Sequence, residues 1–135
     1  MRVVFDTNVL VAAFAADGLC QKLLRRANKQ EFTLLVCPVI LDEFQGVLRK
    51  KLDATKEEIG NALALLHEVS VMTGDTPPAA KPARIVRDPN DDLILFCAVT
   101  AKADFLVTGD NDLLAIKEHG KIKVLDPRRF ELLFG

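Results

Sequence analysis

The stretch VVFDTNVLVAAF, residues 3–14, decides the fold that we expect for this chain. A run of β-branched and aromatic residues over residues 2–5 predicts a short buried strand. The apolar residues that follow predict a helix over residues 9–16. A single carboxylate, Asp6, stands between the two elements, so a buried strand ends directly at a charged side chain. A carboxylate at the end of a buried strand needs a hydrogen-bond donor or a cation to stabilise its charge, and the rest of the sequence indicates which of these it has.

The alternation of strand and helix continues along the chain. Short apolar runs predict further strands, and amphipathic spacing predicts the helices between them. The predicted strands are residues 33–37, 69–72, 105–107 and 123–125, and the predicted helices are residues 19–27, one from residue 38, one from residue 55, residues 91–102, residues 111–117 and a final turn after residue 127. Thr55 and Glu58 have the spacing of a capping box at one helix start. Residues 74–89 lack periodicity and predict a long, Pro-rich loop.

Strands that alternate with helices and are apolar throughout predict an α/β fold, with a parallel sheet covered on both faces. The length of 135 residues, of which 50% are hydrophobic, fits one compact domain over residues 1–135. Ligands of such sheets bind at the carboxyl ends of the strands. The side chains that follow each strand are therefore the candidates for function.

The composition excludes several classes of protein. A net charge of -1 provides no global basic field for nucleic acid. The N-terminus lacks the pattern of a signal peptide, and no apolar run reaches the ~20 residues of a membrane span. We therefore expect a soluble, cytoplasmic protein without a membrane partner. Cys20, Cys37 and Cys97 are widely spaced without a CxxC pair, which favours buried, reduced thiols over a disulfide framework or a zinc site.

Four acids from distant parts of the sequence are predicted to meet at one edge of the sheet. Asp6 and Asp110 each follow a predicted strand directly, and Asp91 opens a predicted helix. Glu43 lies on the shoulder of an apolar helix face at ~100° per residue, whereas Asp42 points to water. The expected site therefore contains Asp6, Glu43, Asp91 and Asp110.

Such a cluster predicts a divalent cation. Carboxylates that share a site repel one another, and Mg²⁺ or Mn²⁺ relieves this repulsion with the oxygen ligands that it prefers. The corresponding chemistry is phosphodiester cleavage by an activated water. Asn8 is expected to orient Asp6 by a hydrogen bond, and Thr108 to orient Asp110.

A structural role is the alternative for each acid taken singly. An acid after a strand is often a helix N-cap or a turn former, and this interpretation is favoured for Asp91, Asp110 and Asp112 one by one. Asp88, Asp92 and Asp104 are interpreted as loop or surface acids. Because Asp91 and Asp110 are predicted at the same edge of the sheet as Asp6, a shared functional site is favoured over separate structural roles.

The chain resembles the PIN-domain family, specifically the small bacterial, VapC-like toxins of toxin–antitoxin pairs. The resemblance rests on four ordered blocks: FDTNVLVAAF, LDEF, RDPNDDLILFCAV and ADFLVTGDNDLL. It implies a three-layer α/β/α sandwich with a five-stranded parallel sheet. It also implies that Asp6, Glu43, Asp91 and Asp110 bind Mg²⁺ or Mn²⁺, with Asp112 as a fifth acid. The aliphatic pair Ile94 and Leu95 favours Asp91 over Asp92 as the third acid. The implied activity is cleavage of single-stranded RNA, by a protein that is often dimeric and is silenced by an antitoxin.

Basic residues flank the predicted cleft. Arg87 precedes the acids of the third block and is a candidate for gripping a substrate phosphate. Residues 49–51 instead suit a helix C-terminus that stays solvated. The sequence contains no Tyr and no Trp, so it supplies few stacking partners for unpaired bases.

Two other functions remain as alternatives to a metal-dependent ribonuclease. The first is a phosphotransferase that uses Asp6 as a covalent nucleophile, but the residue two positions later is Asn8, which cannot act as a general acid. The second is an RNA-binding or regulatory module without catalytic activity, against which the full set of acids argues. No GxGxxG or GxxxxGK[ST] motif indicates nucleotide binding.

Overall fold

The computed structural model describes residues 1–73 and 89–135, and its first strand lies in the middle of a central sheet. This strand, β1 (Arg2–Phe5), pairs in parallel with β2 (Thr33–Val36) on one side and with β4 (Phe105–Val107) on the other. Val3, Val4 and Phe5 are all buried. A strand enclosed on all sides explains why this part of the sequence is apolar without alternation.

The described sheet has the order β3-β2-β1-β4-β6-β5. Its other strands are β3 (Ser70–Met72), β5 (Glu118–His119) and β6 (Ile122–Leu125). The helices are α1 (Thr7–Ala15), α2 (Leu19–Asn28), α3 (Pro38–Lys50), α4 (Lys56–Val69), α5 (Pro89–Thr100), α6 (Asn111–Leu114) and α7 (Pro127–Leu132).

The α/β fold predicted from the sequence is confirmed, with one correction to the sheet. Five parallel strands were expected, whereas the described sheet has six, and β5 pairs antiparallel with β6. β5 has only two residues, which is too short for an apolar periodicity to reveal. Residues 74–88 of the predicted loop lie outside the described residues, and α5 begins at Pro89, two residues earlier than expected.

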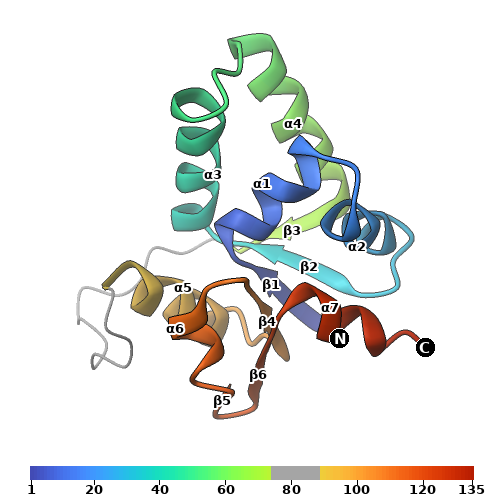
Figure 1. The fold of residues 1–135 in the computed structure, drawn as a ribbon, viewed down its shortest axis with the longest axis vertical. Helices are drawn as coiled ribbons and strands as arrows, with labels where there is room; N and C mark the ends of the chain where they lie inside the picture. Colours follow the sequence, from blue (N-terminus) through green and yellow to red (C-terminus); the bar gives the residue numbers. More distant parts are fainter. Residues whose placement is uncertain (74–88) are drawn as a thin grey trace.

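The helices flank the sheet, and α3 and α4 stand side by side above it (Figure 1). The predicted capping box at the start of α4 is confirmed: the Thr55 hydroxyl accepts the N–H of Glu58 at 3.1 Å, and the Glu58 carboxylate accepts the N–H of Thr55 at 2.9 Å. In the part of the chain that the structure describes, no helix is both long enough and apolar enough to cross a membrane.

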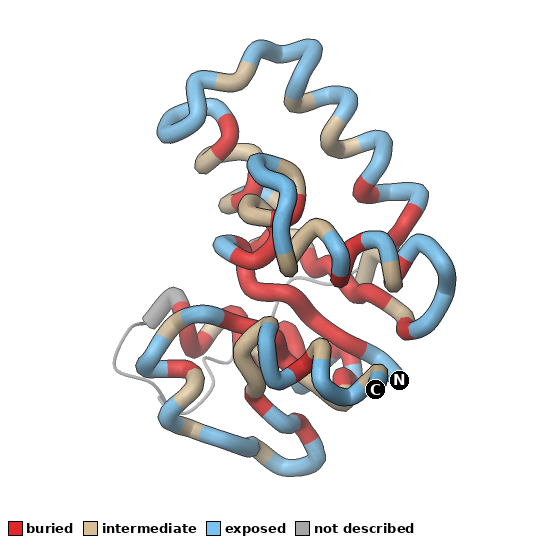
Figure 2. The backbone as a smooth tube through the Cα atoms, turned by 45° about the vertical axis from the view of Figure 1, so that its right-hand side comes forward, coloured by how far each residue is buried: buried red, intermediate tan, exposed pale blue. Residues whose placement is uncertain are grey.

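The core runs through the centre of the molecule along β1 and its neighbours (Figure 2). At one end of this core, helix α7 packs against the sheet through Phe130, whose ring is fully buried. The Phe130 ring packs edge-on against Phe32, with 5.2 Å between their centroids. Glu131, the next residue, accepts hydrogen bonds from Arg26 of α2. Aromatic packing and ion pairing thus hold the C-terminal helix in place.

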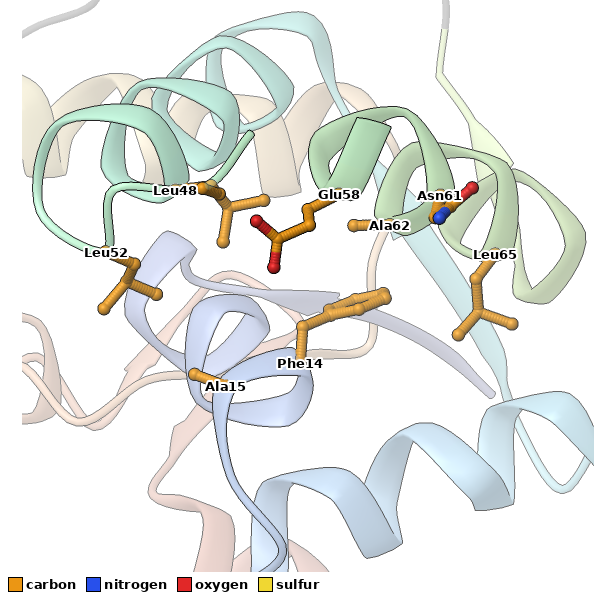
Figure 3. A pocket seen from close by; sticks show the side chains of 9 residues that line it. Phe14, Ala15, Leu48, Leu52, Glu58, Asn61, Ala62 and Leu65 are labelled. Carbon is orange, nitrogen blue, oxygen red and sulfur yellow. The ribbon is translucent and has the colours of Figure 1, made fainter. Parts of the chain in front are cut away.

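A groove of mixed character, with a volume of about 580 Å³, opens between α1, α3 and α4, and the polar side chains of Glu58 and Asn61 line it beside apolar ones (Figure 3). Phe14 lies at its floor, and Leu48, Leu52 and Leu65 line it. Leu52 and Leu65 are 48% and 43% exposed, which leaves apolar surface open to solvent.

Candidate active site

Two neighbouring strands deliver polar side chains to the same edge of the sheet. β1 ends at Phe5, which is paired with Val107 at the end of β4. The ladder continues one step further, since the N–H of Asp6 donates to the carbonyl of Val107 at 2.9 Å. Asp6 and Thr108, which follow the two strands, therefore lie beside each other.

Asp6 is buried, at 5% exposure, and its carboxylate is held on both oxygens. Oδ1 accepts the N–H of Thr7 at 2.6 Å, and Oδ2 accepts the hydroxyl of Thr108 at 2.7 Å. Burial raises the pKa of the Asp6 carboxyl from 3.8, these two hydrogen bonds lower it in part, and the charge of Asp110 raises it again. The net direction is upward, as expected for an acid that is buried near another acid.

Thr108 links two of the predicted acids. While its hydroxyl donates to Asp6, its Oγ1 accepts the backbone N–H of Asp110 at 3.0 Å. The predicted hydrogen bond between Thr108 and Asp110 is therefore present, at the backbone N–H of Asp110, and the Thr108 hydroxyl in addition holds the carboxylate of Asp6. Thr108 itself is fully buried, so this link is shielded from water.

Asp110 combines a structural role with a place in the acidic cluster. Its Oδ1 accepts the N–H groups of Asp112 and Leu113 at 2.8 and 3.2 Å, which caps the short helix α6. The N-cap interpretation of Asp110 thus holds. It does not remove the carboxylate from the site, because Asp91 and Asp112 lie close to it.

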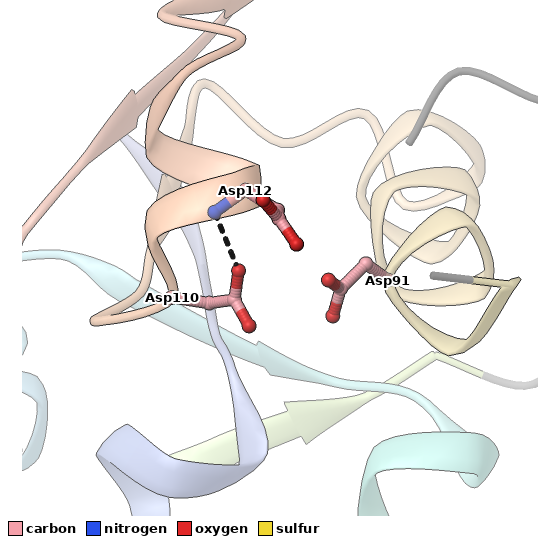
Figure 4. Close-up of side chains that lie close together, drawn as sticks. All are labelled: Asp91, Asp110 and Asp112. Atoms are coloured by element: carbon pink, nitrogen blue, oxygen red, sulfur yellow. Dashed lines mark hydrogen bonds between the residues drawn. The ribbon is translucent and has the colours of Figure 1, made fainter. Parts of the chain in front are cut away.

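Asp91, Asp110 and Asp112 each offer a carboxylate oxygen within 4.8 Å of the others. Their carboxyl groups turn toward a common space between α5 and α6 (Figure 4). Asp91 is buried, Asp110 is half-buried and Asp112 is exposed. The three acids therefore extend from the protein interior to the surface, and a ligand can reach them from the side of Asp112.

Glu43 was predicted to lie with the other acids at this edge of the sheet. It is half-buried on α3, and Asp42 beside it is exposed, as the helical wheel indicated. However, Glu43 does not belong to the group within 4.8 Å among the described residues. Its charge also raises the pKa of the thiols of Cys37 and Cys97 in part.

Three further positions differ from expectation or lie outside the described residues. Asn8 is exposed, and in the described residues the hydrogen bonds to the Asp6 carboxylate come from Thr7 and Thr108. The expectation that Asn8 orients Asp6 is therefore wrong, since the side chain of Asn8, the second residue of α1, is exposed to solvent. Asp92 is buried, at 9% exposure, and is not a surface acid. Arg87 belongs to the undescribed residues 74–88.

The sequence reasoning missed Thr7, whose N–H holds Asp6. A signal for it was present, because an acid between a strand and a helix is often an N-cap that accepts backbone N–H groups. Asp6 is the N-cap of α1.

The donor set fits a hard divalent cation. Asp91, Asp110 and Asp112 offer only carboxylate oxygens, the ligands that Mg²⁺ and Mn²⁺ prefer over the nitrogen and sulfur ligands of zinc. Asp6 adds a further carboxylate close enough to Asp110 for their charges to interact. The chemistry of the side chains thus agrees with the cation predicted from the sequence.

Comparisons with known proteins address the fold and the family. A search among curated proteins finds no match. The chain is similar to VapBC2 from Rickettsia felis bound to a DNA fragment from its promoter, with 20% identity, a TM-score of 0.64 and coverage of 92% of this chain and 97% of that chain. It is also similar to Mycobacterium tuberculosis VapC20, a sarcin-ricin loop cleaving toxin, with 13% identity, a TM-score of 0.58 and coverage of 90% and 98%.

At these identities the two solved structures show a shared fold. The sequence profile of the PIN domain matches residues 2–112, from the start of β1 to the last acid of the cluster. This match spans most of the sequence, and the chain therefore belongs to the PIN domain family.

Proposed function

We propose that this protein is an endoribonuclease that depends on Mg²⁺ or Mn²⁺, hydrolyses phosphodiester bonds of single-stranded RNA and serves as the toxin of a toxin–antitoxin pair. The observation that carries the proposal is the convergence of Asp91, Asp110 and Asp112 within 4.8 Å beside the buried Asp6. Membership of the PIN domain family supports a nuclease, and the similar VapC20 is a toxin that cleaves an RNA loop.

The proposed cation ligands are Asp6, Asp91, Asp110 and Asp112, and Glu43 is the further candidate from the sequence. When bound, the divalent ion supplies an activated water and electrostatic stabilisation of the leaving oxygen. Asp6 is already held by Thr7 and Thr108, so its carboxylate has little freedom left to lose on binding. Asp110 is likewise held by the N–H groups of α6.

The exposure of the acids suits a polymeric substrate. Asp112 lies at the surface and Asp91 in the interior, so a phosphodiester can approach from the side of α6 without unfolding of the chain. The net charge of -1 gives no long-range attraction for RNA. We therefore assign the grip on the substrate phosphate to local cations, with Arg87 as the candidate.

The proposed protein partner is an antitoxin, and a second copy of the chain is a further candidate. The groove lined by Phe14, Leu65 and Glu58 supports a protein partner, because a helix or segment with apolar and polar side chains would cover residues that are otherwise exposed (Figure 3). The similar structure from Rickettsia felis is of VapBC2 bound to a DNA fragment from its promoter.

The phosphotransferase alternative loses support from the surroundings of Asp6. Both oxygens of this carboxylate accept hydrogen bonds, and Asn8 faces solvent two residues later. A covalent nucleophile needs one oxygen directed at the substrate and an acid to protonate the leaving group. A non-catalytic RNA-binding module is the remaining alternative.

Cleavage of labelled single-stranded RNA, with Mg²⁺ or Mn²⁺ and then with a chelator, tests the proposal. We expect cation-dependent internal cleavage that falls by about 10²-fold or more in Asp91→Asn, the loss seen when one electrostatic element of an active site is removed. Asp42→Asn, which removes an exposed acid on α3, is the matched control and should cleave at the wild-type rate.

Each other outcome identifies a different function. A phosphorylated aspartate trapped on the protein would favour the phosphotransferase. Tight binding of RNA without cleavage by the wild-type protein would favour the non-catalytic module. Cleavage that survives both the chelator and Asp91→Asn would refute the cation site.

A further inference from the structure

Among the described residues, positive charge directly after a strand at the carboxyl edge of the sheet is found only after β6. β1, β2, β4 and β6 run in parallel, so their carboxyl ends share this edge with the acidic cluster. The four residues that follow β1, β2 or β4 include no Lys and no Arg, whereas those that follow β6 include Arg128 and Arg129. The start of α7 thus brings cations to the edge at which the acids gather.

The start of α7 lies beside the strand that carries the acids. Val107 of β4 is paired with Leu125 of β6, and the N–H of Thr108 donates to the carbonyl of Leu125 at 3.0 Å. Because neighbouring strands are about 4.8 Å apart, the chain leaves β6 one strand spacing away from Thr108, whose hydroxyl holds Asp6. Gly109, the next residue, is exposed, and a Cβ atom added there would meet nothing within 4 Å. The edge is therefore open to a ligand between α6 and α7.

The fold makes little use of the charge of Arg128. Its side chain is exposed, and within the described residues it forms no ion pair, whereas Nε of Arg129 lies 3.9 Å from Oδ2 of Asp126. Arg128 is also the second residue of α7, a position at which the positive end of the helix dipole disfavours a cation. The guanidinium of Arg128 is therefore available to an anion from outside the protein.

Arg128 borders a hollow of about 350 Å³ between α1, α2 and α7. Most of the side chains that line this hollow are small or apolar, among them those of Ala12, Ala16, Leu19 and Pro127. Its volume lies within the roughly 300–1,000 Å³ of sites that bind small molecules. A cation beside an apolar hollow matches the two parts of a nucleotide, because the phosphate is an anion and every base presents a flat face that stacks on other groups.

We propose that Arg128 and this hollow form a nucleotide subsite for the RNA substrate. The guanidinium binds a backbone phosphate, the neighbouring base enters the hollow, and the RNA strand passes over Gly109 to reach the acids. Acids at the edge repel an RNA backbone, and Arg128 offsets this repulsion from the adjacent strand. The inference rests on the proposed function, because it says where the RNA of that same site is held.

Fluorescence anisotropy of a labelled single-stranded RNA, with a chelator present to prevent cleavage, tests the phosphate contact on the full-length protein. We expect Arg128→Ala to bind about tenfold more weakly than wild type, as for the loss of one hydrogen bond to a charged group. The slope of log affinity against log salt should become shallower by about 0.7, the value for one phosphate contact on a single strand. Arg128→Lys keeps the charge and should keep the wild-type slope.

Two further substitutions serve as a control for charge and a test of the hollow. Arg49→Ala removes the same charge from an exposed position near the end of α3 and should bind RNA as the wild type does. Ala16→Leu fills the hollow and should weaken binding without a change in the salt slope. Ala15→Leu adds the same side chain one residue earlier, where it faces the groove between α1, α3 and α4, and should leave RNA binding unchanged.

Several outcomes would overturn the subsite: no binding of RNA by the wild type, wild-type binding by Arg128→Ala, or equal losses in Arg128→Ala and Arg49→Ala. Wild-type binding by Ala16→Leu would remove the base from the hollow. Because binding is measured without cleavage, the subsite and the nuclease can fail separately. RNA that is held through Arg128 but never cut would refute the nuclease alone, whereas RNA that is cut at the wild-type rate and bound equally well by Arg128→Ala would refute the subsite alone.

Discussion

Charged side chains gather at two places in this molecule, and their charges are combined in opposite ways there. Where α2 meets α7, Arg26 contacts Glu131 and Glu31, so each partly buried charge has an opposite partner. At the carboxyl edge of β1 and β4, acids gather next to acids. The first arrangement stabilises the fold, whereas the second opposes it and is expected where a protein keeps charge for binding.

The direction of the pKa shifts expresses this difference. The hydrogen bond from Arg26 lowers the pKa of Glu131 from 4.5, with further help from Lys22. Burial raises the pKa of Asp6 from 3.8, and Asp110 adds to the increase. Acidification should therefore weaken the ion pair between Arg26 and Glu131, which we call the paired end. It should reduce the repulsion between the acids at the carboxyl ends of β1 and β4, which we call the acidic edge.

The largest expected effect is on the paired end. Phe130→Ala removes a fully buried ring that packs on Phe32 and Phe5, and should destabilise the protein by about 3–5 kcal/mol. Chemical denaturation measures this loss. Leu132→Ala, on the same helix but 72% exposed, should stay close to wild type. Equal losses in the two variants would show that α7 is not anchored by Phe130.

Thr108→Val tests the hydroxyl that joins the two acids at the other end. The variant keeps the shape of the side chain but takes the donor from Asp6, and a lost hydrogen bond to a charged group costs about 1.5–3 kcal/mol. The free energy of unfolding should fall by that amount at neutral pH. Thr108→Ser retains the hydroxyl and should recover most of the loss. A Val variant as stable as wild type would mean that this hydrogen bond does not hold the site.

Glu131→Gln tests the paired end by pH. Because the folded-state pKa of Glu131 is below 4.5, its charge contributes stability above that pH, and the contribution is lost as the pH falls through the folded value. The variant should melt at a lower temperature than wild type at neutral pH, and the difference should vanish in acid. Glu68→Gln, an exposed acid on α4, is the control. A difference that persists in acid would point to packing as its cause.

Asp6→Asn should have the smallest effect on stability, and it should stabilise the protein slightly, whereas the three variants above destabilise it. The folded-state pKa of Asp6 is above 3.8, so the charged form costs stability as the pH rises through that value. Without added metal, the variant should melt at or slightly above the wild-type temperature at neutral pH, and the advantage should shrink in acid. A clear drop in the melting temperature would contradict the idea that this acid is kept at a cost to the fold.

Much of this arrangement was predictable from local patterns. The run before Asp6 predicted a buried strand because a central parallel strand is apolar on both faces, and Thr55 with Glu58 predicted a helix start. Asp6 and Asp110 were correctly placed at one edge, since parallel strands end on the same side of a sheet.

The contacts between elements were not predictable in the same way. The partner of Thr108 depends on β4 lying directly beside β1, which no local pattern reveals. A helical wheel gave the face of Glu43 but not what packs against α3, so the effect of the Glu43 charge on the Cys37 thiol was missed. Asp92 looked like a surface acid because burial of a polar residue depends on what packs over it.

The central claim is that the carboxylates at this edge bind a divalent cation together. Isothermal titration of Mn²⁺ into the metal-free wild-type protein, Asp110→Asn and Asp42→Asn tests it most directly. We predict saturable binding to the wild type and to Asp42→Asn, and affinity at least about tenfold weaker in Asp110→Asn, at or beyond the loss seen when a group that supports a metal site is removed. Equal affinity for all three proteins, or no binding at millimolar Mn²⁺, would contradict the claim.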